Sequence, residues 1–169
     1  HISKIMKRIV LCLLLLVVGF SAAEARKYPF DMNHPYEVQM VRVANQGYKF
    51  IKVSGVAKSV DKAMDRAMQD AVAACVFTGV PGAPSVGAVP SLCGGTAAYE
   101  KHKEYFDDFL KKGEFMHYVK NVNSNYPSGE NNIKVDGGRK VCIYVLVNYD
   151  ALRKKLEEDK IIKSLNSYF

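Results

Sequence analysis

The alternation of hydrophobic and polar positions first becomes regular at residue 37. Residues 37–44 and 48–58 are rich in Val, Ile, Tyr and Phe, and Asn45-Gln46-Gly47 separates the two runs. A glycine in so short a connection supplies the positive φ that a tight hairpin turn needs. The pattern therefore predicts two antiparallel strands joined as a β-hairpin.

The clearest helical pattern covers residues 59–78. Ser59 can cap the start of this helix, and Gly79 follows its end. Small and apolar side chains, mostly alanine, recur on one side at helical spacing; they are Val60, Ala63, Met64, Ala67, Met68, Ala71, Ala74 and Cys75. Because most side chains on this side are small, the pattern predicts a helix that lies close against a sheet. The opposite side carries Gln69 and Asp70 among charged residues, and we expect substitution of Gln69 there to change stability little.

Residues 79–95 interrupt the periodicity. Five glycines and three prolines in this stretch exclude a helix or a regular strand. Connections of this length are usually functional or disordered, so the segment is either a flexible surface loop or a binding element. Its apolar side chains make it the candidate ligand-binding loop: Val80, Val86, Val89 and Leu92.

The second half of the chain predicts two further helices and two or three strands. The expected elements are a helix over 96–112 ended by Gly113, a strand over 114–122, a strand over 140–148 with an early start at 133–135, and a helix over 149–158 with Leu152 and Leu156 inward. The run over 140–148 is almost continuously apolar, which predicts a central strand buried on both faces.

This order of elements predicts an α+β fold. We expect a mainly antiparallel sheet of about four strands packed against two or three helices. A doubly wound fold is excluded because strands and helices do not alternate strictly. Residues 26–36 predict an extended arm, and residues 37–169 a single domain.

Residues 1–25 resemble a targeting segment, and we do not expect them to belong to the folded domain. After His1–Ile5, the stretch Met6-Lys7-Arg8 gives a positive start, residues 9–20 form an apolar run, and Ala23-Glu24-Ala25 supplies a cleavage motif. We predict a signal peptide cleaved before Arg26 and export of the chain to the periplasm or the cell surface. An uncleaved anchor is the alternative; a lipoprotein is disfavoured because Cys12 lies inside the apolar run. No later apolar run is long enough to span a membrane.

The composition is that of a globular protein, with 49% hydrophobic and 24% charged residues. The net charge of +7 is spread along the chain, so it does not argue for a nucleic-acid partner.

Candidate catalytic residues are sparse. His34 falls in the arm, His102 on an apolar helix face and His117 on a predicted strand, and no G-x-S-x-G motif is present. No metal-binding or phosphate-binding motif occurs either. We therefore expect no cofactor, no metal and no enzymatic activity, although a His–carboxylate or His–Cys contact within about 3.2 Å in a cleft would favour an enzyme.

Three cysteines follow the predicted signal peptide. Cys142 lies on the predicted central strand, where we expect a buried reduced thiol. Cys93 lies in the long loop and Cys75 near the end of the first helix, so we predict a disulfide between Cys75 and Cys93.

Two stretches carry family resemblances. The segment 52–57, followed by a helix with Ala63, Ala67, Ala71 and Ala74, resembles the LPP20 lipoprotein type and the N-terminal domain of flagellar assembly protein T. Residues 71–82 and 150–169 are similar to a group of exported Bacteroidales proteins without an assigned activity. These resemblances imply a location in the cell envelope and transfer no functional residue.

Two hypotheses follow for the function. The first is a non-enzymatic exported protein that binds an envelope protein or a cell-surface component. The alternative is a small-ligand-binding periplasmic protein that uses residues 79–95 as a lid. The sequence does not predict an oligomeric state.

Overall fold

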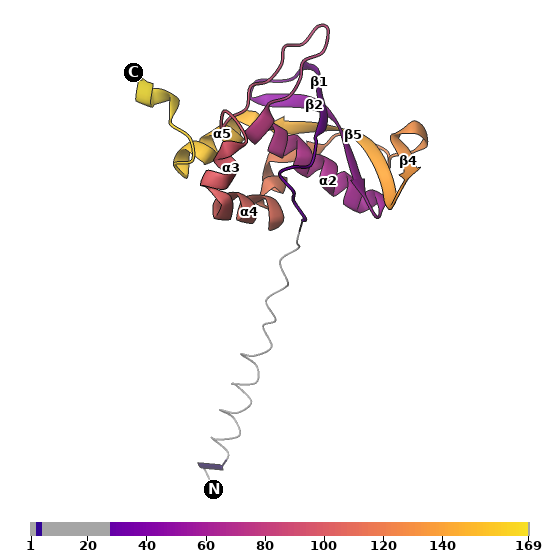
Figure 1. Cartoon of the computed structure of the whole chain (residues 1–169), viewed down its shortest axis with the longest axis horizontal. Coiled ribbons are helices and arrows are strands. Elements are labelled where there is room, and N and C mark those ends of the chain that lie inside the picture. The colour runs from indigo at the N-terminus through magenta and orange to yellow at the C-terminus, as the bar shows by residue number, and fades with distance from the viewer. Residues whose placement is uncertain (1–2, 5–27, 169) are drawn as a thin grey trace.

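The computed structural model describes residues 3–4 and 28–168, and its centre is a five-stranded antiparallel sheet with helices gathered on one side (Figure 1). The predicted α+β fold is confirmed, with one strand more than expected. The strand order is β1-β2-β5-β3, and β4 pairs with the first part of β5. The strands are β1 (Glu37–Val43), β2 (Tyr48–Ala57), β3 (Val119–Asn121), β4 (Asn132–Val135) and β5 (Gly138–Asn148).

Four helices of the described chain cover or flank this sheet. They are α2 (Val60–Ala73), α3 (Ala97–Lys101), α4 (Lys103–Lys111) and α5 (Tyr149–Glu158). A π-helical turn, Ala74–Thr78, continues α2, and short 3₁₀ turns cover Glu114–Tyr118, Gly129–Asn131 and Leu165–Tyr168.

The predicted hairpin is confirmed as β1 and β2. Gly47 takes a φ of +85° in the connection, as the turn requires. The register pairs Glu37 with Ser54 and Val43 with Lys49, and it shifts by one residue between Met40 and Arg42. Such a bulge bends β1, which is the edge strand of the sheet.

Helix α2 lies against the sheet through its alanine side, as predicted. The Ser59 hydroxyl caps the helix by accepting from the Lys62 N–H at 3.3 Å. Ala63 and Ala67 are fully buried, and a Cβ atom added to Gly55 on β2 would overlap the carbonyl oxygen of Ala63. The helix backbone therefore approaches the strand as closely as side chains of this size allow.

Strand β5 is central but is buried on one face only, which corrects the prediction of burial on both. Its side chains alternate, and those that face α2 are fully buried: Val141, Ile143, Val145 and Val147. The intervening side chains are half-exposed, and Cys142 is one of them. The labelled helices α2 to α5 lie on the first face, and within residues 28–168 no helix covers the second (Figure 1).

Two predictions for the second half were wrong in detail. The predicted helix over 96–112 breaks at His102, whose φ is −127°, and Tyr99 and Phe106 on either side of the break both pack against Phe77. Residues 114–118 form a 3₁₀ turn and not a strand, because Gly113 reverses the chain with a φ of +91° and Phe115 turns inward. Helix α5 lies where it was expected, with Leu152 and Leu156 buried.

The described part of the N-terminal arm, residues 28–36, is extended except for a turn in which the His34 N–H donates to the Asp31 carbonyl at 3.1 Å, and it is fixed to the helices. The Tyr28 N–H donates to the Lys111 carbonyl at 2.8 Å, and the Tyr28 ring packs edge-on against Phe115. The predicted signal peptide lies outside the described residues, and of the residues upstream of it only Ser3 and Lys4 are described. Within the described ranges, each helix is too short or too polar to cross a membrane.

Candidate functional site

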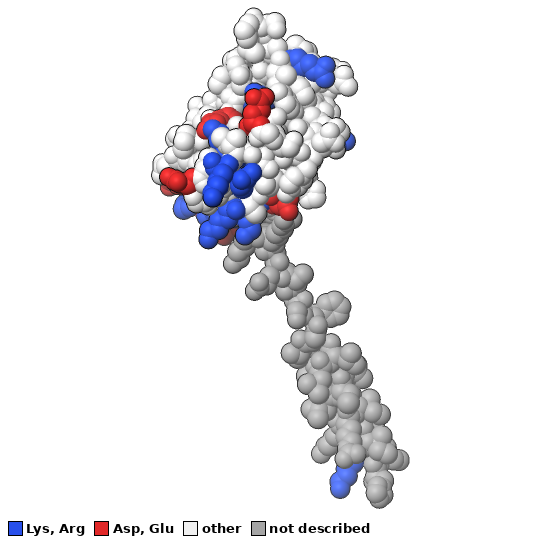
Figure 2. All heavy atoms as spheres, turned by 90° about the vertical axis from the view of Figure 1, so that its right-hand side faces the viewer, with Lys and Arg blue, Asp and Glu red and all other residues white. Residues whose placement is uncertain are grey.

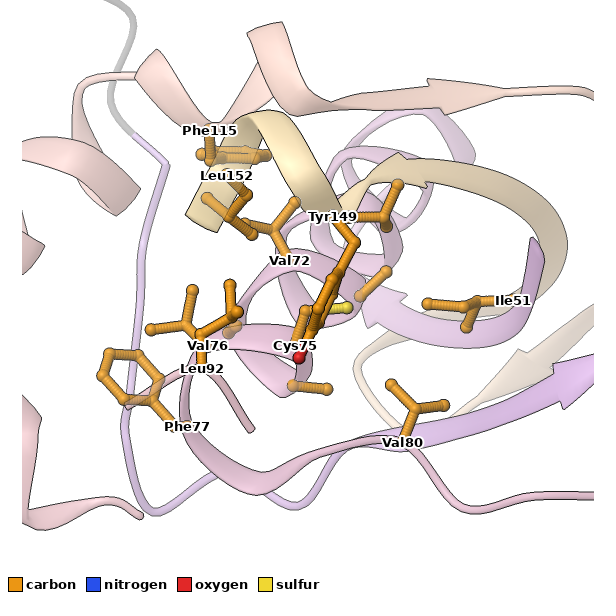
Figure 3. Close-up of a cluster of buried hydrophobic side chains, with 14 of the residues drawn as sticks. Ile51, Val72, Cys75, Val76, Phe77, Val80, Leu92, Phe115, Tyr149 and Leu152 are labelled. Carbon is orange, nitrogen blue, oxygen red and sulfur yellow. The ribbon is translucent and has the colours of Figure 1, made fainter. Parts of the chain in front are cut away.

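The loop over 79–95 does not have the exposed apolar side chains that made it a candidate binding element. Val80, Val89 and Leu92 are buried and Val86 is half-buried. Figure 3 shows Val80 and Leu92 pointing into the same cluster as Cys75. The loop doubles back on itself through the pairs Val80–Val89 and Ala83–Val86, and its middle projects from the body in Figure 1. Its apolar side chains thus serve mainly the core.

Hydrogen bonds fix the C-terminal end of this loop. The N–H groups of Leu92 and Cys93 donate to the carbonyls of Cys75 and Val76, both at 2.9 Å. The Tyr149 hydroxyl donates to the Pro90 carbonyl at 2.7 Å. These bonds hold the loop against the π-helical turn without a covalent link.

The predicted disulfide between Cys75 and Cys93 is not formed, because Cys75, Cys93 and Cys142 are all free thiols. Cys75 points into the core beside Tyr149 (Figure 3), and burial raises the pKa of its thiol to about 12. Burial also raises the pKa of the Cys93 thiol, to about 11. Both thiols are therefore protonated and unreactive near neutral pH.

A hollow of about 330 Å³ lies between the loop and the β1–β2 turn. Val86 to Val89 form one wall, and Asn45 to Lys49 form the other. The wall residues are mainly small side chains and backbone, which offer little to orient a ligand. The lid hypothesis stays a prediction.

A His–carboxylate contact of the kind that would favour an enzyme does occur, at the arm. His34 Nε2 lies 3.1 Å from Oδ2 of Asp70, and Arg66 Nε lies 3.7 Å from Oδ1 of the same carboxyl. Burial raises the pKa of Asp70 to about 7, and burial lowers the pKa of His34. Near pH 7 the His34 ring is therefore mostly uncharged, whereas the Asp70 carboxyl is partly protonated and partly ionised.

Neither member of this pair lines any of the hollows described here. The hollow beside α2 on that side is lined by Arg66 and Gln69, but neither His34 nor Asp70 lines it. A general base has to reach the proton that it removes, so the contact is better explained as a clasp between the arm and α2. His102 is half-buried at the α3–α4 break and His117 is exposed on a 3₁₀ turn, and neither has a catalytic partner assigned to it.

The face of the sheet that points away from α2, here called the open sheet face, has the most distinctive chemistry of the surface. It comprises alternate residues of β2 and β5 and their neighbours on β1 and β3, and none of these residues is buried: Arg42, Phe50, Lys52, Ser54, Lys120, Cys142, Tyr144 and Leu146. A hollow of about 610 Å³ on this face is lined by Arg42, Phe50, Lys120 and Leu146 together with the β1–β2 turn.

Aromatic rings and cations occur together on this face. The rings of Phe50 and Tyr144 stack with centroids 5.9 Å apart and planes 15° from parallel. The Arg42 guanidinium lies 5.0 Å from the centroid of Phe50. The acidic Glu37 at the margin is already paired with Lys140, whose Nζ lies 2.7 Å from Glu37 Oε2. Arg42, Lys52 and Lys120 thus leave the face with a positive character.

Sequence reasoning missed the open sheet face because β5 reads as one continuous apolar run. Tyr144 and Leu146 alternate with buried valines, but their exposure depends on which face the helices cover. The signal that could have found it was the alternation in β2. Lys52 and Ser54 are polar, and they alternate with the apolar Ile51 and Val53.

Comparison of the chain with protein-family models, curated proteins and solved structures gave no match. In the part of the chain that the structure describes, no three His, Cys, Asp or Glu side chains come together as a metal site would require. The function is therefore argued from the surfaces of the molecule.

Proposed function

We propose that this chain is a non-enzymatic binding protein of the cell envelope, and that its open sheet face docks an acidic segment of a partner protein. The observation that carries the proposal is the group of Arg42, Phe50, Tyr144 and Leu146 on a sheet face where none of the outward side chains is buried. Protein interfaces are enriched in aromatic residues and arginine, which supply most of the binding energy.

The charge of the face favours an acidic partner. Arg42, Lys52 and Lys120 are exposed, whereas Glu37 is already satisfied by Lys140. Complementary charge raises the rate of association and selects the orientation of the partner. We therefore expect binding to weaken as ionic strength rises.

A protein partner is favoured over an anionic glycan. Sugars bind to aromatic residues through free ring faces, but the Phe50 ring already contacts Arg42 and Tyr144. The aliphatic side chains of Leu146 and Val122 line the same hollow, and they need apolar side chains opposite them.

The location in the envelope is supported by the targeting pattern over residues 1–25 and by the resemblance of 71–82 and 150–169 to exported Bacteroidales proteins. An exported binding protein without a catalytic centre agrees with the clasp role of the His34–Asp70 pair, which has no hollow of its own.

The proposal is tested by site-specific crosslinking in the native host. A photoreactive phenylalanine derivative replaces Tyr144, and a matched one replaces Lys154 on α5, whose side chain is 77% exposed. We expect the first to crosslink to one protein at a segment rich in Asp and Glu, and the second not to. The double substitution Arg42→Glu and Lys120→Glu should abolish the crosslink from position 144.

Three outcomes would contradict the proposal. They are equal crosslinking from both positions, crosslinking that survives the charge reversal, and covalent capture of a glycan in place of a protein. Circular dichroism of the double variant serves as the folding control, since both substituted side chains are exposed.

A further inference from the structure

A second hollow, here called the arm–helix cleft, lies beside the polar side of α2. It has a volume of about 520 Å³ and lies between the start of the arm at Tyr28 and Pro29, the end of β2 at Val56 and Ala57, and the polar side of α2. This volume falls in the range of sites that hold a small organic molecule.

A buried amide with an unused acceptor lines this cleft. The Gln69 side chain is only 1% exposed, and its Nε2 donates to the Leu110 carbonyl at 3.1 Å and to the Tyr28 carbonyl at 3.5 Å. Both partners are carbonyl oxygens, which only accept, so the orientation of the amide is fixed with Nε2 toward them. Oε1 of Gln69 is buried and has no hydrogen-bond partner. Because Oε1 has almost no accessible surface, an N–H or O–H group of a ligand satisfies it when the lining residues shift to admit the ligand.

Cations surround the mouth of the cleft. Lys58 and Lys62 are exposed, Arg66 is half-buried, and Asp65 is the one acidic residue in the lining. Figure 2 views the end of the molecule that carries β4 and the beginning of α2, and Lys and Arg side chains gather there next to the point where the described chain begins. The mouth of the cleft therefore attracts anions.

We infer that the arm–helix cleft binds a small carboxylate that carries an amide N–H or hydroxyl donor. The donor bonds to Oε1 of Gln69, the carboxylate lies toward Lys58 and Lys62, and an apolar part of the ligand fills the space between Pro29 and Val56. The site shares no residue with the open sheet face, so it does not depend on the proposed docking function.

The test uses three related probes and the purified protein, followed by amide and side-chain NMR shifts. The first probe is N-acetyl-leucine, which has the carboxylate, the N–H donor and an apolar side chain. N-acetyl-leucine amide lacks the charge, and N-acetyl-N-methyl-leucine lacks the donor. We expect saturable shifts of the Gln69 side-chain amide and of the Lys62 backbone with the first probe below about 10 mM, and affinities about tenfold weaker for each of the others.

A charge reversal at the mouth provides an independent readout. The double variant Lys58→Glu and Lys62→Glu should weaken binding of N-acetyl-leucine by about tenfold or more, whereas Lys154→Glu on α5 should leave it unchanged. The open-face variant Arg42→Glu with Lys120→Glu should also bind the probe normally, which separates this inference from the proposed function.

The inference is overturned if N-acetyl-leucine shifts none of the residues that line the cleft. It is overturned equally if the N-methyl analogue binds as tightly as the parent probe, because Oε1 of Gln69 then receives no hydrogen bond from the ligand. Unchanged affinity in the Lys58→Glu and Lys62→Glu variant would have the same consequence for the role of the cations.

Discussion

Both sides of α2 contain fully buried residues, but the two sides differ in chemistry. The side toward the sheet consists of Ala63, Ala67 and Ala71, which present only methyl groups to Gly55 and the strands. The opposite side buries Gln69 and Asp70 under the arm and α4, and three of its polar atoms lack a hydrogen-bond partner: Arg66 Nε, Gln69 Oε1 and Asp70 Oδ1.

The sheet side of α2 therefore stabilises the fold, whereas the buried polar atoms on the arm side destabilise it. Burying methyl groups against a sheet stabilises the native state, whereas each unpaired buried polar atom costs about 1–3 kcal/mol. Proteins keep such costs mainly where a ligand, a switch or another function uses them. The arm side of α2 is therefore where function is expected, and the sheet side is where stability is expected.

The largest effect is expected on the sheet side, from Gly55→Val. The new side chain would overlap the backbone of α2 at Ala63 and Ala67, so the helix has to move away from the sheet. The free energy of unfolding should fall by more than about 3 kcal/mol in urea denaturation. Ser54→Val, the adjacent position on the open sheet face, is the control and should change stability by less than about 1 kcal/mol. Similar values for the two variants would mean that α2 and β2 are not in close contact.

A smaller effect on the free energy of unfolding is expected when the pH is changed, and it arises on the arm side of α2. Burial raises the pKa of Asp70 from 3.8 to about 7, so between these values the folded state binds more protons than the unfolded state. Stability contributed by this group falls as the pH rises from about 4 to about 7. The lowered pKa of His34 acts in the opposite direction. We expect a net loss of about 2–3 kcal/mol over this interval.

Asp70→Asn checks this expectation, because it removes the titrating carboxyl and keeps its shape. Urea midpoints measured from pH 4.5 to pH 8 should fall with rising pH in the wild type and change less in the variant. A wild-type stability that rises steadily with pH would contradict the burial of Asp70.

The two sides can also be compared directly through Ala67→Leu and Gln69→Leu. The first overpacks the contact with the sheet, and the second leaves the Leu110 carbonyl without its donor. Each should cost about 1–2 kcal/mol in thermal or chemical unfolding. The sequence pattern alone predicted little change on substitution of Gln69, so a neutral Gln69→Leu would support that interpretation and contradict the docking of the arm.

The smallest effect concerns reactivity and leaves stability unchanged. Cys75 is fully buried, whereas Cys142 is half-exposed on the open sheet face. Brief alkylation of the native protein should label Cys142 and spare Cys75, and alkylation after denaturation should label Cys75, Cys93 and Cys142 alike. Mass spectrometry of the peptides gives the answer, and a peptide linked through Cys75 and Cys93 would contradict it.

The sheet side of α2 could be predicted from sequence because the pattern that defines it lies within one short stretch of the chain. Alanines recurring at helical spacing after a strand define a narrow face, and the cap at Ser59 and the stop at Gly79 define its length. The hairpin before it and α5 after β5 were likewise predicted from local patterns and are present.

The arm side and the open sheet face could not be predicted, since their environment depends on distant segments. Gln69 is buried by Tyr28 and Leu110, each 41 residues away along the chain. The exposure of Tyr144 depends on all helices packing against the other face of β5. In both cases the residue types were visible in the sequence, but the neighbours that cover or expose them were not.

The pairing of β2 with β5 has a consequence for how this chain folds. The register joins Tyr48 to Asn148 and Ala57 to Arg139, so the two central strands are separated by most of the domain. Contacts between such distant segments slow folding, because the long intervening chain has to be ordered first. Synthesis starts at the N-terminus, so β2 stays without its central partner until the chain has been made as far as Asn148 at the end of β5.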